Sequence, residues 1–520
     1  MRSSVGSLVR AGSALLMVLV AVLLVGCGGG GGSGTGGGGD AQPQAGGTLT
    51  VAQGLEAITL DPIEAVDYPS VHAISQINET LFKADVSGKV VPWLASRAEQ
   101  SADGLTWTIQ LRPGVKFSDG KPLTAADVVF SLEAVRGSAN WGFMFESIKS
   151  ITAKSPNTVV IALAKPVAAL EAELSLFAAA IVPDNYGGES EKAFAQHPVG
   201  TGPFMFDSWQ QGQAMNLDRN PHYWRPGKPL VDHLVLKAIP DDNSRISQLK
   251  GGQIDVMERP PWSQLESLKQ APELIVNESD PGLNSFMMMN LRQAPFDDAR
   301  LREAVNLAVD REGIIAAAAG GAGEPSASWF PPALLYHDTS IVPPKQDLAK
   351  AKQLVAEAAK DGADTSATLS LTAGESYAAA AGQIVQQNLE EVGFKITLQP
   401  IDEAALLENE QGGKFDFAIT YVGTDIPDPS ELVTFYAATE GFYSGADTTE
   451  FSKLVTASDS ELNSDKRRQL FYEMQEEIYE ENNLIGLVYQ PYVWATQDSV
   501  AGFENNALNN PVFANVGFDE

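Results

Sequence analysis

The residue types that most often perform catalysis are sparse in this 520-residue chain and do not gather. None of the five histidines pairs at the i,i+4 spacing of a His-Glu-x-x-His zinc site, and there is one cysteine. The chain has no Gly-x-Ser-x-Gly elbow, no Gly-x-x-x-x-Gly-Lys-Ser/Thr loop and no EF-hand spacing. We expect no catalytic residue, metal site or cofactor, although a serine or aspartate nucleophile assembled from distant residues stays open. The histidines are His72, His197, His222, His233 and His337.

The single cysteine, Cys27, stands at a position suited to lipid modification. Arg2 and Arg10 precede an apolar run from residue 11 to 25, which is shorter than the roughly 20 residues needed to span a bilayer. The run ends in Leu-Val-Gly-Cys, which resembles a bacterial lipobox, where the cysteine sulfur is acylated and the chain is cut before it. An ordinary secretory signal with a chance cysteine is the alternative. We expect residues 1–26 to be a lipoprotein signal peptide and the rest to work outside the cytoplasm, anchored to the membrane by lipid at Cys27.

In the segment 27–47, residues 28–39 are almost all glycine with one serine and one threonine, and residues 40–47 add Gln, Pro and Ala. Such a composition cannot bury apolar surface and is typical of a flexible tether. A glycine-rich run can also bind phosphate, but only between a strand and a helix. We therefore interpret this segment as a tether between the lipid and the folded body.

Composition narrows the function further. The chain carries a net charge of −31, which argues against nucleic-acid binding and against a basic membrane-binding surface. Removal of residues 1–26 leaves too many residues for one hydrophobic core and enough for two or three domains. With Cys27 acylated no thiol remains, which excludes disulfides, thiolate catalysis and cysteine-bound zinc. Contact with the membrane is expected through the N-terminal lipid only.

Strand and helix patterns alternate along the chain, which indicates an α/β fold. Residues 47–51 read as a first strand, 70–81 as a helix, and 106–111 as a half-buried strand. Thr124 and Asp127 have the spacing of a capping box. Further helices are predicted from residues 242 or 243 to 250, 298–309, 378–392 and 464–481, with strands at 254–256, 394–398, 415–422 and 484–489.

One long motif identifies a resemblance. Residues 103–131 read DGLTWTIQLRPGVKFSDGKPLTAADVVFS and resemble the signature of the family 5 extracellular solute-binding proteins, the receptors of peptide, dipeptide and nickel ABC importers. Four further blocks follow in the family's order and spacing. They are TLDP at 59–62; GTGPF at 200–204 with RNPHYW at 219–224; MNL at 289–291 with PFDD at 295–298 and REA at 302–304; and DRE at 310–312.

This resemblance implies the fold class. It is an α/β, two-lobed periplasmic-binding-protein clamshell of the type II kind, with an additional domain inserted into lobe one. By block order, lobe one would combine residues 45–78, 200–284 and 485–520. The inserted domain would be 79–199 and lobe two 285–484, with a hinge near residues 284 and 484.

The resemblance also implies where a ligand binds. In dipeptide and oligopeptide receptors the loop matching Tyr421–Leu432 carries an aspartate that pairs with the α-ammonium of the peptide, and Asp425 aligns with it. Asp428 has a local role instead, because Asp followed by Pro suits the start of a helix. Thr424 and Pro427 depart from many relatives, which leaves the exact ligand open.

Three further residues are candidate ligand contacts. Tyr421 ends its strand, Trp329 lies on a loop of lobe two, and Asn290 belongs to a strand that enters lobe two. Aromatic residues in such places also serve as core.

The predicted function is a monomeric, lipid-anchored receptor that closes over a peptide-like solute and delivers it to an ABC permease. The same mechanism could serve a metal chelate, an opine or an oligosaccharide. A secreted hydrolase and a chaperone-like lipoprotein are the alternatives from other classes.

Overall fold

The computed structural model describes residues 44–438, 445 and 449–519 of the chain. Cys27 and nearly all of the predicted tether therefore lie outside the described residues. No helix within the described ranges is both long and apolar enough to cross a bilayer.

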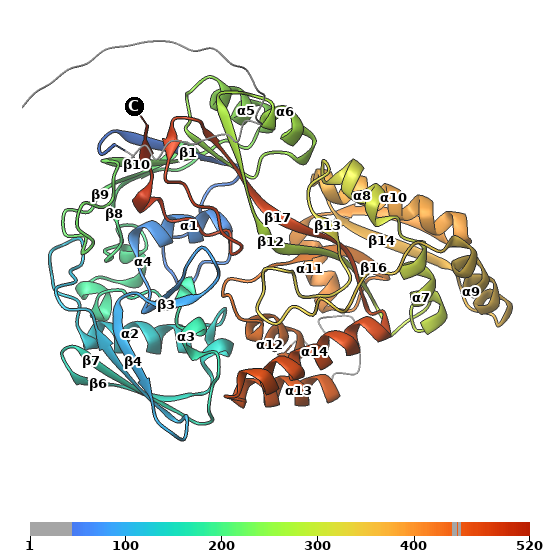
Figure 1. The fold of residues 1–520 in the computed structure, drawn as a ribbon, viewed down its shortest axis with the longest axis horizontal. Helices are drawn as coiled ribbons and strands as arrows, with labels where there is room; N and C mark the ends of the chain where they lie inside the picture. The colour runs from blue at the N-terminus through green and yellow to red at the C-terminus, as the bar shows by residue number, and fades with distance from the viewer. Residues whose placement is uncertain (1–43, 439–444, 446–448, 520) are drawn as a thin grey trace, which may run out of the picture. The chain divides into compact units, whose positions relative to one another are not determined.

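An eleven-stranded sheet runs through the protein in the order β15-β14-β16-β12-β17-β11-β1-β10-β9-β8, with β13 (Glu324–Pro325) paired to β17 (Figure 1). One end, which we call lobe one, is built around β1 (Thr48–Gln53), whose neighbours β10 (His233–Ala238) and β11 (Val256–Glu258) are parallel to it. Two antiparallel strands, β9 (Ala214–Arg219) and β8 (Phe204–Gln210), complete this end.

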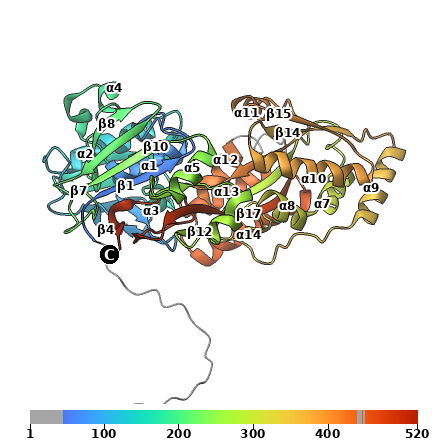
Figure 2. The same cartoon turned by 90° about the horizontal axis from the view of Figure 1, so that it is seen from above.

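The other end, lobe two, contains β16 (Phe417–Val422), β14 (Ser366–Thr372) and β15 (Lys395–Ile401) in parallel array. Helices on one face share a single buried cluster with the sheet, and α8 packs against α10 and β17 (Figure 2). The second face is covered by a separate cluster that includes residues of α12, α13 and α14. The helices are α7 (Ala299–Ala308), α8 (Arg311–Ala318), α9 (Leu348–Lys360), α10 (Ser376–Val392), α11 (Glu403–Gln411), α12 (Ser430–Ala438), α13 (Thr449–Ser460) and α14 (Ser464–Glu481).

Two long antiparallel strands connect the lobes. The strands β12 (Leu274–Met289) and β17 (Leu484–Gln497) pair along their lengths, and their register shifts between Glu278 and Phe286. Shifts of this kind bend and twist a strand pair. The lobes are thus joined by a bent two-stranded connection, which lies near the hinge expected from the sequence.

A four-stranded antiparallel sheet, β4-β5-β7-β6, is separate from the eleven-stranded sheet, and we call this small sheet with its helix α2 (Ala125–Arg136) the third layer. In β5 (Thr106–Leu111) buried and half-buried residues alternate, as the sequence predicted. Its neighbours are β4 (Ala95–Gln100), β6 (Ile148–Ser155) and β7 (Thr158–Leu163), and α2 packs against β6 and β7. Residues of this layer share one hydrophobic cluster with lobe one, so the two are packed together. The predicted residue boundaries of lobes and insert stay predictions.

Shorter elements fill the remaining connections. The helices are α1 (Tyr68–Ile77), α3 (Leu170–Glu173), α4 (Glu191–Phe194), α5 (Asp242–Lys250) and α6 (Leu265–Lys269); the strands are β2 (Phe82–Ala84), β3 (Val90–Pro92), β18 (Val500–Ala501) and β19 (Gly517–Phe518).

Most predicted elements are present, with shifts at their ends. The capping box of Thr124 and Asp127 is confirmed, and α14 begins at Ser464 as predicted. The helix expected at 70–81 is wrong at both ends. It starts at Tyr68, where Asp67 caps it, and stops at Ile77, because Asn78 takes an extended conformation. Leu81 is buried as predicted but lies beyond the helix.

Candidate functional site

The loop after β16 crosses from lobe two to lobe one. Ile426 in this loop is 0% exposed and belongs to the hydrophobic cluster of lobe one. Gly423 comes so close to the Tyr492 hydroxyl that a Cβ atom there would lie 2.5 Å from it. A larger residue at 423 would therefore displace the loop or the tyrosine. The loop is fixed by an apolar anchor at one point and a close backbone approach at another.

Asp425, beside this anchor, forms a carboxyl pair with Glu431. The backbone N–H groups of Asp425 and Ile426 donate to Glu431 Oε2 at 2.9 and 3.2 Å, and the two carboxyl groups share a hydrogen bond. Burial raises the pKa of Asp425 to about 6. Burial and the Asp425 charge raise the pKa of Glu431 well above its usual range. Asp425 is thus the more acidic member of the pair, and the proton that the two carboxyl groups share is favoured on Glu431.

Asp428 is engaged differently, in a buried ion pair. Its two oxygens accept from the Arg467 guanidinium at 2.6 and 2.8 Å, with side-chain exposures of 7% for Asp428 and 4% for Arg467. Asp428 Oδ1 also accepts from the N–H of Ser430, where α12 begins, at 2.9 Å. The Arg467 charge holds the pKa of Asp428 below its usual range despite burial. Asp428 therefore supports the start of the helix, as predicted, and in addition ties α14 to the loop.

Asp425 also lines a cavity whose other walls come from lobe one and its packed third layer. The side-chain amide of Asn78 is 3% exposed, and neither its nitrogen nor its oxygen has a hydrogen-bond partner among the described residues. The same holds for Asn510 Oδ1. Buried amide groups without partners are rare in folded proteins. These amide atoms are themselves covered in the described arrangement, so they do not face the open space of the cavity.

Glu79 in the same wall is, by contrast, fully used. Its carboxylate accepts hydrogen bonds from the side chains of Trp93, Thr201, Tyr223 and Trp224 at 2.7 to 3.0 Å. Lys83 lies over the Trp93 ring, 4.9 Å from its centroid, and burial lowers the pKa of its amine. Glu79 thus organises the wall rather than presenting a free charge.

A group of tyrosines lies between the lobes. The hydroxyls of Tyr68, on α1, and Tyr492, on β17, are 2.9 Å apart. In lobe two, the Tyr421 hydroxyl donates to Glu375 Oε2 at the start of α10. Both Asp425 and the Arg259 guanidinium act electrostatically on the hydroxyls of Tyr68 and Tyr492. The structure thus places Asp425 where the lobes meet, whereas the contacts of Tyr421 lie within lobe two.

Trp329 and Asn290 lie elsewhere. Trp329 packs in a lobe-two cluster with Phe330 and Phe451. The Asn290 amide donates to the carbonyls of Gly413 and Phe415 and accepts from the N–H of Arg292. Neither residue lines the cavity that contains Asp425. A ligand role for these two stays a prediction without geometric support.

The sequence reasoning did not identify Tyr68, Tyr492, Arg259 or Glu375. The first two lie 424 residues apart, so no local pattern could pair them. The one local signal was the arginine in front of two prolines at 260 and 261, an unusual position for a long charged side chain.

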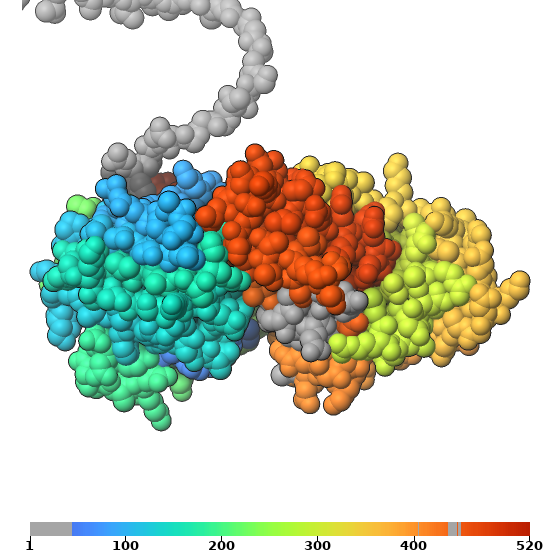
Figure 3. Space-filling model, turned by 90° about the horizontal axis from the view of Figure 1, so that it is seen from below, coloured from blue at the N-terminus to red at the C-terminus, as the bar shows by residue number. Residues whose placement is uncertain are grey.

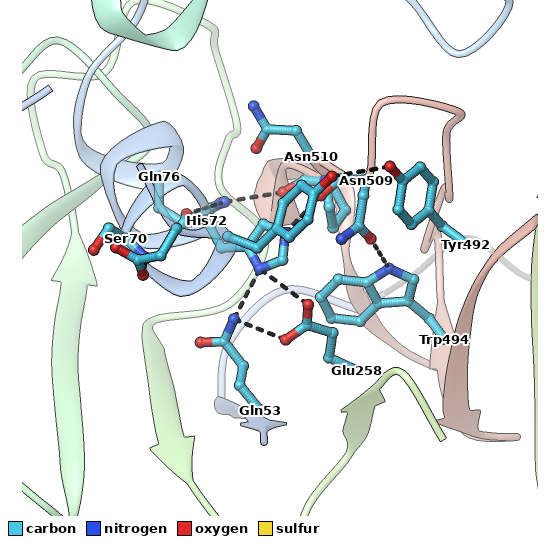
Figure 4. Close-up of polar contacts among 12 residues, drawn as sticks. Gln53, Ser70, His72, Gln76, Glu258, Tyr492, Trp494, Asn509 and Asn510 are labelled. Atoms are coloured by element: carbon cyan, nitrogen blue, oxygen red, sulfur yellow. Dashed lines mark hydrogen bonds and ion pairs between the residues drawn. The ribbon is translucent and has the colours of Figure 1, made fainter. Parts of the chain in front are cut away.

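His72 illustrates why isolated histidines in the sequence were not informative. It lies in a buried network that joins β1, β11, α1 and the C-terminal segment (Figure 4). Gln53 Nε2 lies 2.7 Å from His72 Nδ1 and 3.2 Å from Glu258 Oε2, while His72 Nε2 lies 2.5 Å from the carbonyl of Asn509. Trp494 Nε1 donates to Asn509 Oδ1 at 3.0 Å. Apart from Asn509 Nδ2, which has no partner among the described residues, these polar groups satisfy one another, so the network stabilises lobe one.

Contacts between the lobes extend beyond the cavity. Lys165, after β7, forms an ion pair with Asp459 of α13 at 3.2 Å, and the N–H of Ala168 donates to the Asp459 carbonyl at 2.8 Å. In Figure 3 the orange-red segment that carries α13 and α14 lies against the blue and cyan segments. The described arrangement is thus one in which the lobes touch around the cavity. Within the described residues, no group of three or more His, Cys, Asp or Glu side chains could hold a metal ion.

Comparison with known proteins provides independent evidence. The family model of the bacterial extracellular solute-binding proteins, family 5 (Middle), matches residues 89–444. The glutathione-binding protein GsiB of Salmonella typhi is 30% identical over 484 residues, covering 88% of this chain and 92% of the relative.

Two solved structures extend the comparison to the fold. The periplasmic binding protein DppA of Helicobacter pylori, in complex with the peptide STSA, superposes with a TM-score of 0.80 at 26% identity, covering 92% of this chain and 99% of that chain. NikA of Brucella suis, in complex with Fe(III)-EDTA, gives 0.82 at 25% identity, covering 90% of this chain and 99% of that chain. The expected two-lobed α/β fold is thereby confirmed. The inserted domain stays a prediction.

Proposed function

This chain belongs to the family 5 bacterial extracellular solute-binding proteins, and we propose that its solute is a peptide with a free amino terminus. Membership makes the protein a receptor that works outside the cytoplasm with an ABC transporter. The relatives named above bind glutathione, a peptide and a metal chelate, so the family alone does not fix the ligand. The choice among them depends on the geometry around Asp425.

The observation that carries the proposal is the position of the half-buried Asp425 carboxyl in the cavity wall, where it is the more acidic member of its pair with Glu431. Among the described residues, its carboxylate has no Lys, Arg or His partner, in contrast to Asp428. A buried charge without a counter-ion is costly, and a ligand cation would remove that cost. The α-ammonium of a peptide is such a cation, and it would bind in the cavity that Asp425 lines.

The mechanism of closure follows from the lobes that supply the proposed ligand contacts. Asp425 and Tyr421 belong to lobe two, whereas Asn78 and Tyr68 belong to lobe one. A ligand that touches both sets gains its full interaction only when the lobes are together, so binding shifts the population toward that state. Ile426 is buried in lobe one in the same state, so closure also removes an apolar side chain from water.

Three further features belong to the proposal. Cys27 would carry the lipid that anchors the receptor at the outer side of the membrane, and residues 27–47 would be the tether. The receptor would act as a monomer. It would release its ligand unchanged.

A metal chelate is the second candidate, favoured by the similarity to NikA. A chelate such as Fe(III)-EDTA is anionic and would not pair with Asp425, so it makes the opposite demand on this site from a peptide ammonium.

The test is calorimetric titration of the protein with a peptide and with its N-acetylated form. If the ammonium binds at Asp425, acetylation should weaken binding by roughly 30-fold or more, since a charged partner is lost. Equal affinity for the two forms would contradict the proposal.

A further inference from the structure

Arg259 stands out because its guanidinium has no partner. Among the residues that the structure describes, no hydrogen bond or ion pair is made by this side chain, although its backbone N–H donates to the carbonyl of Val493 at 3.0 Å. The residue is exposed. Neighbouring arginines of the fold are used: Arg245 donates to the carbonyl of Ile239 at 2.7 Å, and Arg467 pairs with Asp428.

The backbone of Arg259 is also in an unfavourable conformation. Its φ angle is +46°, in the left-handed region that residues with a Cβ avoid, and Pro260 follows it. A residue before proline normally takes an extended conformation. Glycine or asparagine would hold this position at lower cost, and such conformations concentrate at functional sites. The unfavourable backbone conformation indicates that the Arg259 side chain has a role.

The surroundings of the guanidinium show what that role requires. Tyr68 and Tyr492 share one hydrogen bond, which uses one of their two hydroxyl protons and leaves the other to donate elsewhere. Glu258 and Glu375 also lie close enough to keep the pKa of Arg259 above its usual range in spite of burial by surrounding atoms. Both carboxylates are occupied: Glu258 by Gln53, and Glu375 by Tyr421 and the N–H of Ala378.

We propose that Arg259 is a specificity-determining residue that binds a carboxylate of the solute, beside the Tyr68–Tyr492 hydroxyl pair on which Asp425 also acts. The inference rests on the proposed function, since it assumes that the solute lies between the lobes. A planar guanidinium binds a carboxylate through two parallel hydrogen bonds, and the free tyrosine proton adds a donor. The solute would thus carry its ammonium toward Asp425 and a carboxylate toward Arg259.

An ion pair with Glu375 is the competing role for Arg259. It would join lobe one to lobe two and favour closure for every ligand alike. The two roles differ in one respect, because only a carboxylate site distinguishes an acid from its amide.

The experiment uses a mixed tripeptide library prepared in three forms: free acids, C-terminal amides and N-acetylated acids. Native mass spectrometry compares the amounts retained by the wild-type protein, by R259Q and R259K, and by R97Q, a control arginine on the exposed strand β4. R259Q breaks no hydrogen bond or ion pair among the described residues and removes only the attraction to Glu258 and Glu375, so its Tm should fall only slightly.

We expect the wild type to retain acids over amides by about 10-fold or more, and R259Q to show a ratio within about twofold of one. R259K should show an intermediate ratio of acids to amides, because lysine keeps the charge but cannot form the two parallel hydrogen bonds of a guanidinium. R97Q should match the wild type. Preference for acids that persists in R259Q would overturn the inference, as would equal weakening of acids and amides. The N-acetylated arm tests Asp425 separately, so failure there leaves the result for Arg259 intact.

Discussion

Replacing Asp425 by asparagine removes the charge that we assign to the ligand ammonium while keeping the shape of the side chain. The loop should stay in place, because the N–H groups of Asp425 and Ile426 bind Glu431 and the Ile426 side chain is buried in lobe one. The change therefore acts on binding rather than on folding.

The magnitude follows from the burial of the pair. Removing one partner of a buried charge pair typically costs about 2–5 kcal/mol, or roughly 30- to 5,000-fold in affinity. The raised pKa of Glu431 indicates that this carboxyl is neutral and donates to Asp425. An amide donates in the same way, so E431Q is a matched control that should bind within about threefold of the wild type.

The assay is a double-mutant cycle by calorimetric titration, with the wild type and D425N each measured against a peptide and its N-acetylated form. The two losses should not add, because each removes the same interaction. Additive losses would refute the direct pairing of the ammonium with Asp425. Unchanged affinity in D425N would refute it as well, and would favour a solute without an amino terminus.

Three other outcomes are expected. D428N keeps a helix-capping oxygen but leaves Arg467 buried without a counter-charge, so it should destabilise lobe two by about 3–5 kcal/mol in urea unfolding. The control D465N lies in an exposed ion pair and should change stability by less than about 1 kcal/mol. A cost of D428N near that of the control would contradict the role of the ion pair. Affinity for the ammonium should fall as Asp425 is protonated below its pKa of about 6, so calorimetry at pH 5 should give a Kd about tenfold weaker than at pH 7. If D425N showed the same pH dependence, Asp425 would not be the group that binds the ammonium. C27S lacks the sulfur that is acylated and should stay uncleaved or leave the membrane fraction on cell fractionation; a variant as firmly lipidated as the wild type would rule out the lipobox.

The sequence predicted the fold well because its signals are local or belong to long motifs. The capping box at Thr124 and the alternation in residues 106–111 depend on neighbours a few positions away, and both are present in the structure. The end of the first helix was missed because Asn78 ends it through its own conformation, while the apolar spacing continues to Leu81.

The candidate site was predictable only where one loop carries it. Tyr421 and Asp425 lie in a single segment, but the structure places only Asp425 in the cavity wall, while Tyr421 contacts Glu375 within lobe two. Arg259 and the Tyr68–Tyr492 pair come from segments far apart in the chain, so their meeting depends on the tertiary fold. The Arg467 partner of Asp428 lies 39 residues away and changes the expected role of that aspartate from a cap alone to half of a buried ion pair.

Asn290 and Trp329 show the limit of reasoning from residue type. Both are polar or aromatic residues on segments that enter lobe two, yet the structure buries each at a site of its own. Asn290 uses its amide to hold the chain near Gly413 and Phe415. In a sequence, a buried residue that makes hydrogen bonds to backbone groups cannot be distinguished from a residue that contacts a ligand.

The most direct test of the account is to identify what the protein holds when it is purified from its own host. Native mass spectrometry, followed by release and sequencing of the bound species, should give an intact peptide with a free amino terminus and a free carboxylate. Its mass should be unchanged after prolonged incubation with the protein. A bound species without a primary amine, or conversion of added peptides to fragments, would contradict the claim that this receptor captures and releases peptides.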